Sequence, residues 1–361
     1  MIAPWWSRLA SLAAPSLAGA RLARRLSTGG SARGATGGAQ VLRVHDVTAR
    51  DGIQNEKTVL SVAQKADLVR NLVAMGPHSV EVCSFVREDY VPAMAGAAAL
   101  CAQLLAADWA GAARRGGMGF AGLVPNLHGY KSFVRASGAA AGLEGHARAL
   151  DTVVVLVSCT ESHSRANVKM PLDKALDVAC DIARAARADG FQVRAYASMA
   201  FLCPFEGAVA PDAVLRVVER FAQVDERAPA ARSVAPTLVC LADTLGRAEA
   251  DSVRALLPAV IALLGSPDRV GLHLHNAHGL ATRNVEAAAR LGVRSFDCSV
   301  GGTGGCNFVP DAQGNIASQQ VLAAADALGL RSTVDRLRLD ECTSMLEKLL
   351  ARPLETRYTR A

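Results

Sequence analysis

Short runs of β-favouring residues alternate along the chain with longer stretches in which apolar residues recur every three or four positions. The short runs predict eight strands, at residues 41–47, 79–84, 118–123, 152–157, 192–197, 237–241, 270–275 and 295–300. The longer stretches predict amphipathic helices between them, such as residues 62–75, 172–188, 212–224, 249–264 and 282–291.

Eight strands that are each followed by a helical pattern predict an α/β protein with a (β/α)8 barrel, the TIM barrel. A doubly wound sheet is the alternative, because periodicity alone does not separate the two folds. The Gly-x-Gly-x-x-Gly fingerprint of a dinucleotide-binding doubly wound sheet does not follow the first strand. Residues 334–350 predict an extra C-terminal helix packed on the barrel. Residues 137–149 and 227–236 are expected to be long surface loops, so residues 41–361 are expected to form one domain.

The composition of the first 40 residues indicates a targeting segment rather than a part of the fold. Six of the 39 basic residues lie within the first 45 positions, all of them arginine, and no Asp or Glu accompanies them. An Arg-rich, Ser-rich and acid-free segment is typical of a mitochondrial transit peptide, with plastid import as a minor variant. A disordered tail without a role is the alternative. We expect the mitochondrial matrix as the location.

The net charge of +6 comes from this first segment, because residues 46–361 carry 33 basic and 33 acidic side chains. A neutral body gives no reason to expect a nucleic-acid partner. No run approaches the roughly 18 apolar residues of a membrane-spanning helix, so no membrane partner is expected either. Nine cysteines occur without a Cys-x-x-Cys pair, which excludes zinc ribbons and thioredoxin-type motifs.

Unusual polar residues fall near the carboxyl ends of the predicted strands, where the reaction site of such a barrel is built. The candidates are Arg50, Asp51, Tyr196, Asp243, His273, His275, Cys306 and Asn315, with Glu81 inside the second strand. Their gathering at one end of the strands is itself an argument for the barrel.

His273 and His275 are two residues apart on a strand and therefore point to the same face, toward the barrel axis. A divalent metal is one way to satisfy two buried imidazoles, and core histidines bonded to carbonyl groups are the alternative. Asp51 and Asn315 at the same barrel end favour the metal. Two imidazoles, a carboxylate and an amide oxygen predict an octahedral ion such as Mg²⁺ or Mn²⁺ rather than structural zinc.

Arg50 either holds Asp51 in a salt bridge or stabilises an oxyanion in the transition state. Glu81 shares a strand face with Ser79 and Cys83, so an inward Glu81 would need a partner, either Arg50 or a metal-bound water. The glycine-rich residues 301–305 are a flexible turn or a closing loop. In the second case Cys306 would lie over the site as a proton donor or acceptor.

A series of short motifs lies in or after the predicted strands, in this order: ARDGIQNEK (49–57), SVEVCSF (79–85), VPNLHGY (124–130), CPFEG (203–207), ADTLG (242–246), HLHNAHG (273–279), GGTGGC (301–306) and GN (314–315). With these motifs in this order, the chain resembles the 3-hydroxy-3-methylglutaryl-CoA lyases. The resemblance implies a metal-dependent barrel, commonly a homodimer, that cleaves 3-hydroxy-3-methylglutaryl-CoA to acetyl-CoA and acetoacetate in leucine breakdown and ketone-body formation.

The resemblance also implies roles for individual residues. The metal ligands are expected to be Asp51, His273, His275 and Asn315, and the enolate-stabilising arginine Arg50. Cys306 corresponds to the loop cysteine, and Glu81, Asp243 and Tyr196 fall on further active-site positions, while His273 is one candidate for the base. Contacts to the CoA arm are expected from Lys57, Arg165 and Asn167.

Some motif positions differ from the family pattern, among them Asn276, where Asp is usual, and His278, where an aromatic residue is usual. These differences leave open a homologous 3-hydroxy-acyl-CoA substrate. A synthase of the same barrel family that condenses acetyl-CoA with a 2-oxo acid is a further alternative. Such synthases carry an additional C-terminal domain, for which about 30 residues after the barrel leave no room. A barrel without activity that serves as a binding partner is the non-enzymic alternative.

Overall fold

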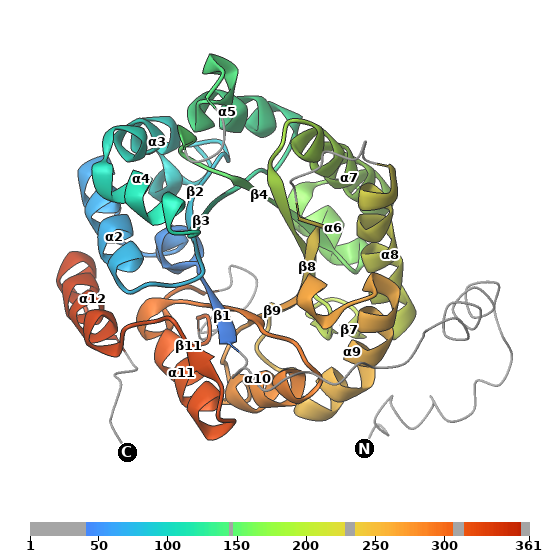
Figure 1. Ribbon diagram of the computed structural model, residues 1–361. Coiled ribbons are helices and arrows are strands. Elements are labelled where there is room, and N and C mark those ends of the chain that lie inside the picture. Colours follow the sequence, from blue (N-terminus) through green and yellow to red (C-terminus); the bar gives the residue numbers. More distant parts are fainter. Residues whose placement is uncertain (1–40, 144–146, 228–234, 306–313, 355–361) are drawn as a thin grey trace, which may run out of the picture.

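Eight parallel strands form the centre of the molecule in a computed structural model that describes residues 41–143, 147–227, 235–305 and 314–354 (Figure 1). The predicted leader at residues 1–40 and the position of Cys306 lie outside these residues. The barrel strands are β1 Val41–Asp46, β2 Ser79–Ser84, β3 Gly119–Leu123, β4 Thr152–Ser158, β5 Gln192–Ser198, β8 Leu238–Asp243, β9 Val270–Leu274 and β10 Ser295–Cys298.

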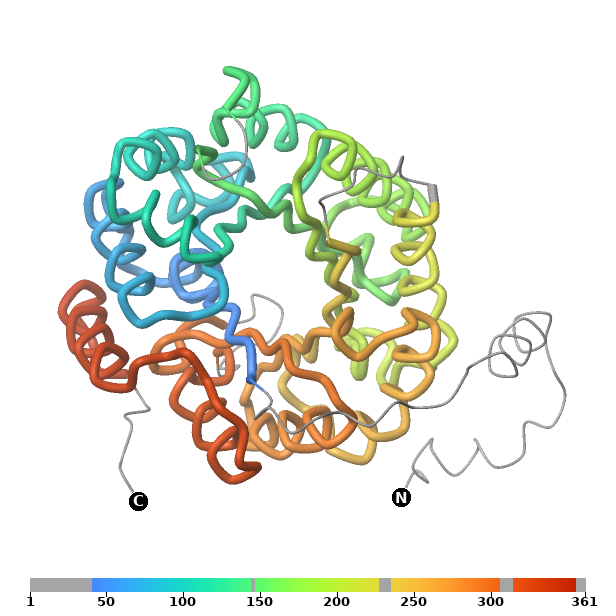
Figure 2. Tube along the Cα trace, viewed as in Figure 1, coloured from blue at the N-terminus to red at the C-terminus, as the bar shows by residue number. Residues whose placement is uncertain are grey.

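The sheet closes on itself. Its strand order is β1-β2-β3-β4-β5-β8-β9-β10, and β10 pairs in parallel with β1, with Asp297 opposite His45. Figure 2 shows the blue first strand beside the orange strands from late in the chain. This closure confirms the predicted TIM barrel and excludes the open doubly wound sheet.

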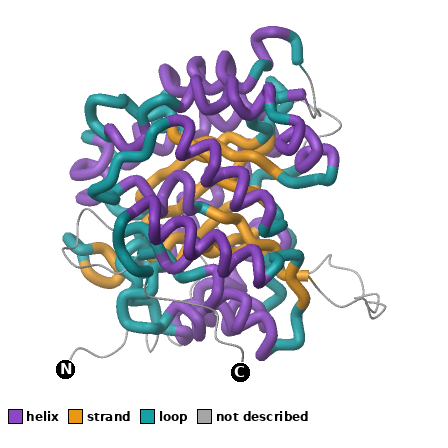
Figure 3. The backbone as a smooth tube through the Cα atoms, turned by 90° about the vertical axis from the view of Figure 1, so that its left-hand side faces the viewer, coloured by secondary structure: helices purple, strands orange, loops and turns teal. Residues whose placement is uncertain are grey.

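Helices surround the strands on the outside, as the side view shows (Figure 3). They are α2 Val62–Ala74, α3 Ala97–Ala106, α4 Asp108–Arg115, α5 Leu127–Ser137, α6 Glu161–Val168, α7 Leu172–Ala188, α8 Pro211–Arg227, α9 Ala250–Leu264, α10 Ala281–Arg290, α11 Ser318–Ala327 and α12 Arg336–Leu350. The five helices whose residue ranges were predicted are present, and their ends lie within a few residues of the predicted ones. The extra C-terminal helix is confirmed as α12, which contacts α2.

Three shorter strands in the described part of the chain lie outside the barrel ring. β6 Leu202–Cys203 and β7 Gly207–Ala208 form a small antiparallel hairpin after β5. β11 Arg331–Ser332 pairs in parallel with the start of β1. The hairpin carries Phe205 at its tip, and its Glu206 accepts hydrogen bonds from the backbone and hydroxyl of Ser162, which tie it to the start of α6.

The main hydrophobic core lies between the strands and the helices. Outward-facing strand residues such as Val153, Val155 and Leu272 pack there against helix residues such as Leu176 and Leu257. A small second cluster lies inside the barrel. Burying one such aliphatic side chain contributes about 1.5–3 kcal/mol, so the outer layer stabilises the barrel that positions the site.

Some predicted boundaries were wrong, and one predicted loop contains a helical turn that the sequence did not indicate. The eighth barrel strand ends at Cys298 rather than at residue 300, because the chain turns at Val300–Gly302, where Gly301 has a φ of 61°. The loop predicted at residues 137–149 contains a short helical turn at Ala139–Ala141. α8 continues to Arg227, three residues beyond the predicted end of this helix at residue 224.

No single helix in the described ranges is both long and apolar enough to cross a bilayer. The segments Pro92–Ala106 and Asp108–Arg115 reach the required length and composition only as a pair, and they meet at a bend of 77°. Leu100 and Leu104 of this pair are buried in the main core.

Candidate active site

A polar cavity of about 140 Å³ opens at the carboxyl ends of the barrel strands. Arg50, Asp51, Tyr196, His273 and His275 all line it, although they come from sequence segments more than 200 residues apart. The barrel therefore brings together residues that the sequence predicted at one end of the strands.

The turn after β1 supplies the first two of these residues. Thr48–Gly52 forms a single wide helical turn, which begins where the backbone N–H of Thr48 donates to Oδ1 of Asp46 at 2.9 Å. A Cβ atom on Gly52 would lie 2.6 Å from Oγ1 of Thr303, so only glycine allows the glycine-rich loop to approach this closely. The turn thus holds Arg50 and Asp51 against that loop.

A group of potential metal ligands converges in the cavity. Asp51, His273 and His275 each place one ligand atom so that all three atoms lie within 4.8 Å of one another. Asn315 joins them, since its Nδ2 donates to Oδ2 of Asp51 at 2.8 Å. The four predicted ligands are therefore neighbours in space.

The donor set fits a divalent cation. Oδ1 of Asn315 and Nδ1 of His275 are buried and have no hydrogen-bond partner among the described residues. Burial and the neighbouring His273 lower the pKa of His275 to about 4, which keeps its ring neutral with a lone pair for coordination. Burial acts to raise the pKa of Asp51, but Arg50 and the histidines lower it to about 2, so Asp51 is a carboxylate. Oxygen and imidazole donors without a thiolate suit Mg²⁺ or Mn²⁺.

His273 is held in place by Asp297 of β10, a residue the sequence analysis did not name. Nδ1 of His273 lies 3.1 Å from Oδ2 of Asp297. Oδ2 also accepts a hydrogen bond from the hydroxyl of Tyr196, and Oδ1 accepts one from Arg194. Burial opposes charge on Asp297, but the Arg194 guanidinium holds the pKa of its carboxyl below the usual range. Anionic Asp297 in turn raises the pKa of His273 against the effect of burial.

Tyr196 lies at the cavity wall, as its position near the end of the fifth strand predicted. Its ring packs edge-to-face against the imidazole of His273, with ring centroids 5.6 Å apart. Since its hydroxyl is bonded to Asp297, Tyr196 orients His273 from two sides.

Glu81 is fully buried and accepts a hydrogen bond from Arg50. It lies where the regular pairing of β2 is interrupted. The pairing of β2 with β3 shifts register between Glu81 and Cys83, which is a β-bulge. The expectation that Cys83 shares the inward face of Glu81 is wrong, because Cys83 packs in the outer core, where its thiol contacts that of Cys101 on α3. Glu81 therefore pairs with Arg50, one of the two partners predicted for it.

Asp243 is placed differently from the other predicted catalytic residues. Its carboxylate accepts the backbone N–H groups of Arg247 at 3.2 Å and Ala248 at 2.8 Å, which shapes the turn after β8. Burial raises the pKa of Asp243 to about 6. Its neighbours Ala242 and Thr244 line the cavity, whereas Asp243 is not among the lining residues.

The three residues predicted to contact CoA are only partly brought together. Asn167 lines the cavity near the end of α6. Arg165 is exposed and donates to Oε1 of Glu161 at 2.6 Å, and Lys57 is exposed outside the lining. Cys306 lies beyond the last described residue of the loop, but Gly305 lines the cavity directly before it.

Other lining residues were missed by the sequence analysis. Ser198 and Thr244 place their hydroxyl oxygens 3.2 Å apart at the ends of neighbouring strands. Their positions within three residues of the ends of predicted strands were a usable signal, as was the inward phase of Asp297 in the eighth strand. Leu123 and Leu156 gave no such signal, because apolar residues are expected in every strand.

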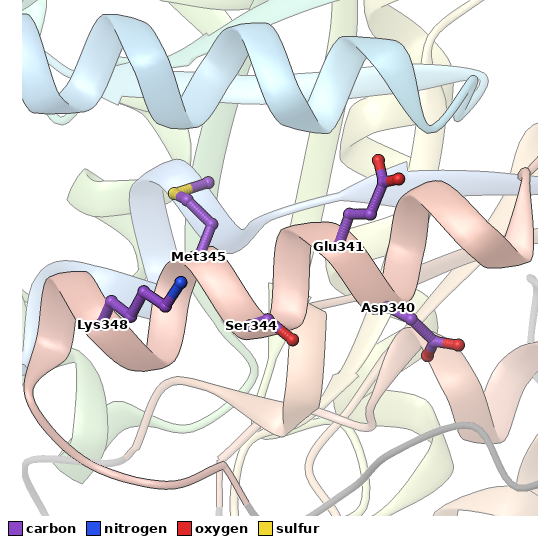
Figure 4. A pocket seen from close by; sticks show the side chains of 5 residues that line it. All are labelled: Asp340, Glu341, Ser344, Met345 and Lys348. Atoms are coloured by element: carbon purple, nitrogen blue, oxygen red, sulfur yellow. The ribbon is translucent and has the colours of Figure 1, made fainter.

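A second hollow lies on the outer surface along α12 (Figure 4). Met345 and Glu341 project toward α2, whereas Asp340 and Ser344 point away from it. These side chains do not converge on a point, in contrast to the cluster inside the barrel.

Comparison with known proteins agrees with this geometry. Residues 41–346 match the model of the HMGL-like family. The chain is 33% identical to hydroxymethylglutaryl-CoA lyase of Pseudomonas mevalonii over 82% of this chain and 88% of that protein. It is 34% identical to (R)-citramalyl-CoA lyase of Chloroflexus aurantiacus over 87% of this chain and 93% of that protein.

A solved structure extends the comparison to the fold. The HMG-CoA lyase of Acinetobacter baumannii in complex with coenzyme A and 3-methylmalate superposes with a TM-score of 0.77 at 27% identity, covering 91% of this chain and 99% of that one. From the barrel, the convergent ligand cluster and these matches together, the chain belongs to the HMGL-like family and is a carbon–carbon lyase.

Proposed function

We propose that the protein cleaves 3-hydroxy-3-methylglutaryl-CoA to acetyl-CoA and acetoacetate. The observation that carries the proposal is the convergence of Asp51, His273, His275 and Asn315 beside the Arg50 guanidinium in one cavity. A hydroxyl group and the oxygen of a thioester enolate are the two groups that such an arrangement can bind and stabilise together.

The four clustered residues would hold Mg²⁺ or Mn²⁺. When bound, such an ion supplies Lewis acidity that lowers the pKa of a coordinated hydroxyl. The unpaired Oδ1 of Asn315 and the neutral ring of His275 are the features of this chain that support the assignment.

The reaction removes the proton of the C3 hydroxyl, forms the ketone at C3 and breaks the C2–C3 bond. His273 and Asp51 are the candidates for the base, and Asp51 is favoured, because His273 as a metal ligand would have both ring nitrogens engaged, Nδ1 with Asp297 and Nε2 beside His275 in the ligand cluster. The electron pair of the broken bond moves into the thioester, where Arg50 stabilises the enolate oxygen. Cys306 then protonates the enolate carbon to give acetyl-CoA.

The CoA arm extends out of the barrel mouth. A cavity of about 140 Å³ accommodates an acyl group but not the nucleotide. Asn167 is placed to contact the arm near the mouth, and Lys57 and Arg165 would contact it farther out.

Citramalyl-CoA is the second candidate substrate. It shares the tertiary hydroxyl, the methyl group and the thioester, and the relative that cleaves (R)-citramalyl-CoA is as similar in sequence as the hydroxymethylglutaryl-CoA lyase. Cleavage of citramalyl-CoA would give pyruvate in place of acetoacetate, so the product identifies the substrate.

The deciding experiment incubates the purified full chain with Mg²⁺ and each ester separately. Acetoacetate from the first ester supports the main proposal, and pyruvate from the second with no acetoacetate from the first replaces it. A third reaction contains acetyl-CoA and a 2-oxo acid. Release of free CoA there, without cleavage of either ester, would indicate the condensing synthase, and three inactive reactions would indicate a non-enzymic barrel.

We also propose a homodimer in the mitochondrial matrix, with a role in leucine breakdown and ketone-body formation. The Arg-rich, acid-free first 45 residues support the location. Import of a fluorescent protein fused to residues 1–45 tests it, and diffuse cytosolic fluorescence would contradict it. Light scattering during size-exclusion chromatography tests the dimer, and the mass of a single chain would contradict it.

A further inference from the structure

Leu156 exposes apolar surface inside the barrel. It lies in β4, where Val153, Val155 and Val157 pack outward in the main core, while Val154 faces the interior. By the same alternation Leu156 also faces the interior, yet 38% of its surface is accessible, because it lines the cavity. Leucine in the middle of a barrel strand is normally covered on both faces, so this surface is left for a ligand to cover.

Leu156 does not stand alone. Leu123 on β3 lines the same cavity and packs with the interior cluster, as does Ala242 on β8. We call Leu123, Leu156 and Ala242 the apolar wall. The exposed surface of Leu156 is therefore part of a group of apolar lining residues on three strands.

The two leucines of the apolar wall lie across the barrel from the strand that carries His273 and from the strand that precedes Asn315. In the closed strand order, β3 is four strands from β9 in either direction, and β4 is four strands from β10. Figure 1 shows β4 on the side of the ring opposite β1 and β9. His273 is on β9, and Asn315 follows β10. A small ligand held by the cluster therefore presents its opposite side to Leu123 and Leu156.

The substituents of the carbinol carbon determine which group of the ligand faces Leu123 and Leu156. Its hydroxyl goes to the ligand cluster, and the thioester arm leaves through the mouth past Arg50. Its carboxylate-bearing arm needs polar partners, such as the hydroxyls of Ser198 and Thr244. The alkyl substituent is the remaining group, and it alone gains free energy by covering leucine surface.

We infer that the apolar wall binds the alkyl substituent of the carbinol carbon and that Leu156 sets the largest substituent the enzyme accepts. This inference rests on the proposed function, and it applies to 3-hydroxy-3-methylglutaryl-CoA and citramalyl-CoA alike, since both carry a methyl group there. Removing one methylene contact in such a pocket changes discrimination by roughly 10- to 200-fold.

The test compares three synthetic esters, 3-hydroxyglutaryl-CoA and its 3-methyl and 3-propyl derivatives. For each enzyme the kcat/KM of acetyl-CoA formation is measured, and the propyl-to-methyl ratio is taken. The wild type is expected to prefer methyl over both hydrogen and propyl. Leu156→Ala is expected to raise the propyl-to-methyl ratio at least about tenfold, and Leu156→Phe is expected to lower it. Leu337→Ala serves as the matched control, since Leu337 is a 69% exposed leucine on α12 outside the cavity lining, and its ratio should equal that of the wild type.

Thermal unfolding of each variant separates folding effects from specificity. If the alanine variant does not fold, Leu156→Val shortens the side chain while keeping a β-favouring residue and gives the same comparison. Ratios that stay within twofold of the wild type in the folded Leu156 variants overturn the inference and leave the lyase proposal intact. A wild-type enzyme that forms acetyl-CoA from none of the three esters, and from citramalyl-CoA neither, overturns the proposed function itself.

Discussion

The guanidinium of Arg50 donates hydrogen bonds to both carboxylate oxygens of Glu81. Nε of Arg50 lies 2.7 Å from Oε1 and Nη2 lies 3.0 Å from Oε2, and the third nitrogen, Nη1, donates to Asp51. Glu81 is fully buried, and Arg50 holds the pKa of its carboxyl below the usual range against the effect of burial. This two-bonded pair fixes the plane of the guanidinium beside the metal-ligand cluster.

Arg50→Lys should therefore impair catalysis even though it keeps the charge, because the lysine ammonium lacks the planar group that forms two parallel hydrogen bonds to Glu81. We expect kcat to fall by roughly 10²–10³. Steady-state kinetics with 3-hydroxy-3-methylglutaryl-CoA measures the change. Arg87→Lys is the control, since Arg87 is an exposed arginine that also forms two bonds to a carboxylate, that of Asp89. Less than a threefold loss in the Arg50 variant would contradict the proposed role.

His275→Ala should remove a metal ligand while leaving the fold intact. We expect the affinity for Mn²⁺ to drop by more than about 100-fold, as measured by titration calorimetry, with an unchanged circular dichroism spectrum. The control is His278→Ala, which replaces an exposed histidine three residues farther along the chain. Wild-type Mn²⁺ stoichiometry in the His275 variant would refute the ligand assignment.

Cys306→Ser should slow turnover without changing metal binding, because a hydroxyl is a far weaker acid than a thiol. General acid catalysis contributes about 10²–10⁴, which sets the expected loss in kcat. Both kcat and the Mn²⁺ affinity of the same preparation are measured. If the metal is lost together with activity, Cys306 has a structural role and the proton-donor assignment fails.

Asp46→Asn should change how stability depends on pH. Burial raises the pKa of Asp46 to about 7, against the hydrogen bond from Thr48, whereas the ordinary pKa of an exposed aspartate is 3.8. Between about pH 4 and 7 the folded chain keeps a proton that the unfolded chain has released, so rising pH lowers the free energy of unfolding. Three pKa units correspond to at most about 4 kcal/mol.

Asparagine cannot ionise, so the free energy of unfolding of the variant does not fall with rising pH through this group. Urea denaturation at pH 4.5, 6 and 7.5 should show the stability of the Asp46 variant rising relative to the wild type across this range and levelling off above about pH 7. Asp67→Asn, at an exposed position, controls for the removal of a charge. A difference that does not depend on pH would show that Asp46 is ionised in the folded protein throughout.

The sequence was sufficient for the barrel and for the ligand cluster. Period-2 and period-3.6 patterns mark strands and helices because each element buries one face, and eight such units in succession favour a closed parallel barrel. Asp51, His273, His275 and Asn315 could be predicted together, since every strand of such a barrel delivers its carboxyl end to the same mouth.

The partners inside the barrel could not be predicted in this way. The bulge in β2 separates the faces of Glu81 and Cys83, and strict alternation had placed them together. Asp297 reaches Arg194 and His273 because β5, β9 and β10 curve around one axis, and curvature is a property of the closed sheet. Asp243 accepts hydrogen bonds from backbone N–H groups in the turn after β8. The residue type alone does not show whether a carboxylate faces a ligand or a turn.

What the amino-acid sequence determined by itself was the order of elements and the chemistry available at each strand end, because both depend on local patterns of side chains. Only the tertiary structure decided which partners these groups meet inside the barrel. The closed ring set Leu123 and Leu156 across from the strands β9 and β10, and that opposition comes from the number of strands between them rather than from any feature of either segment.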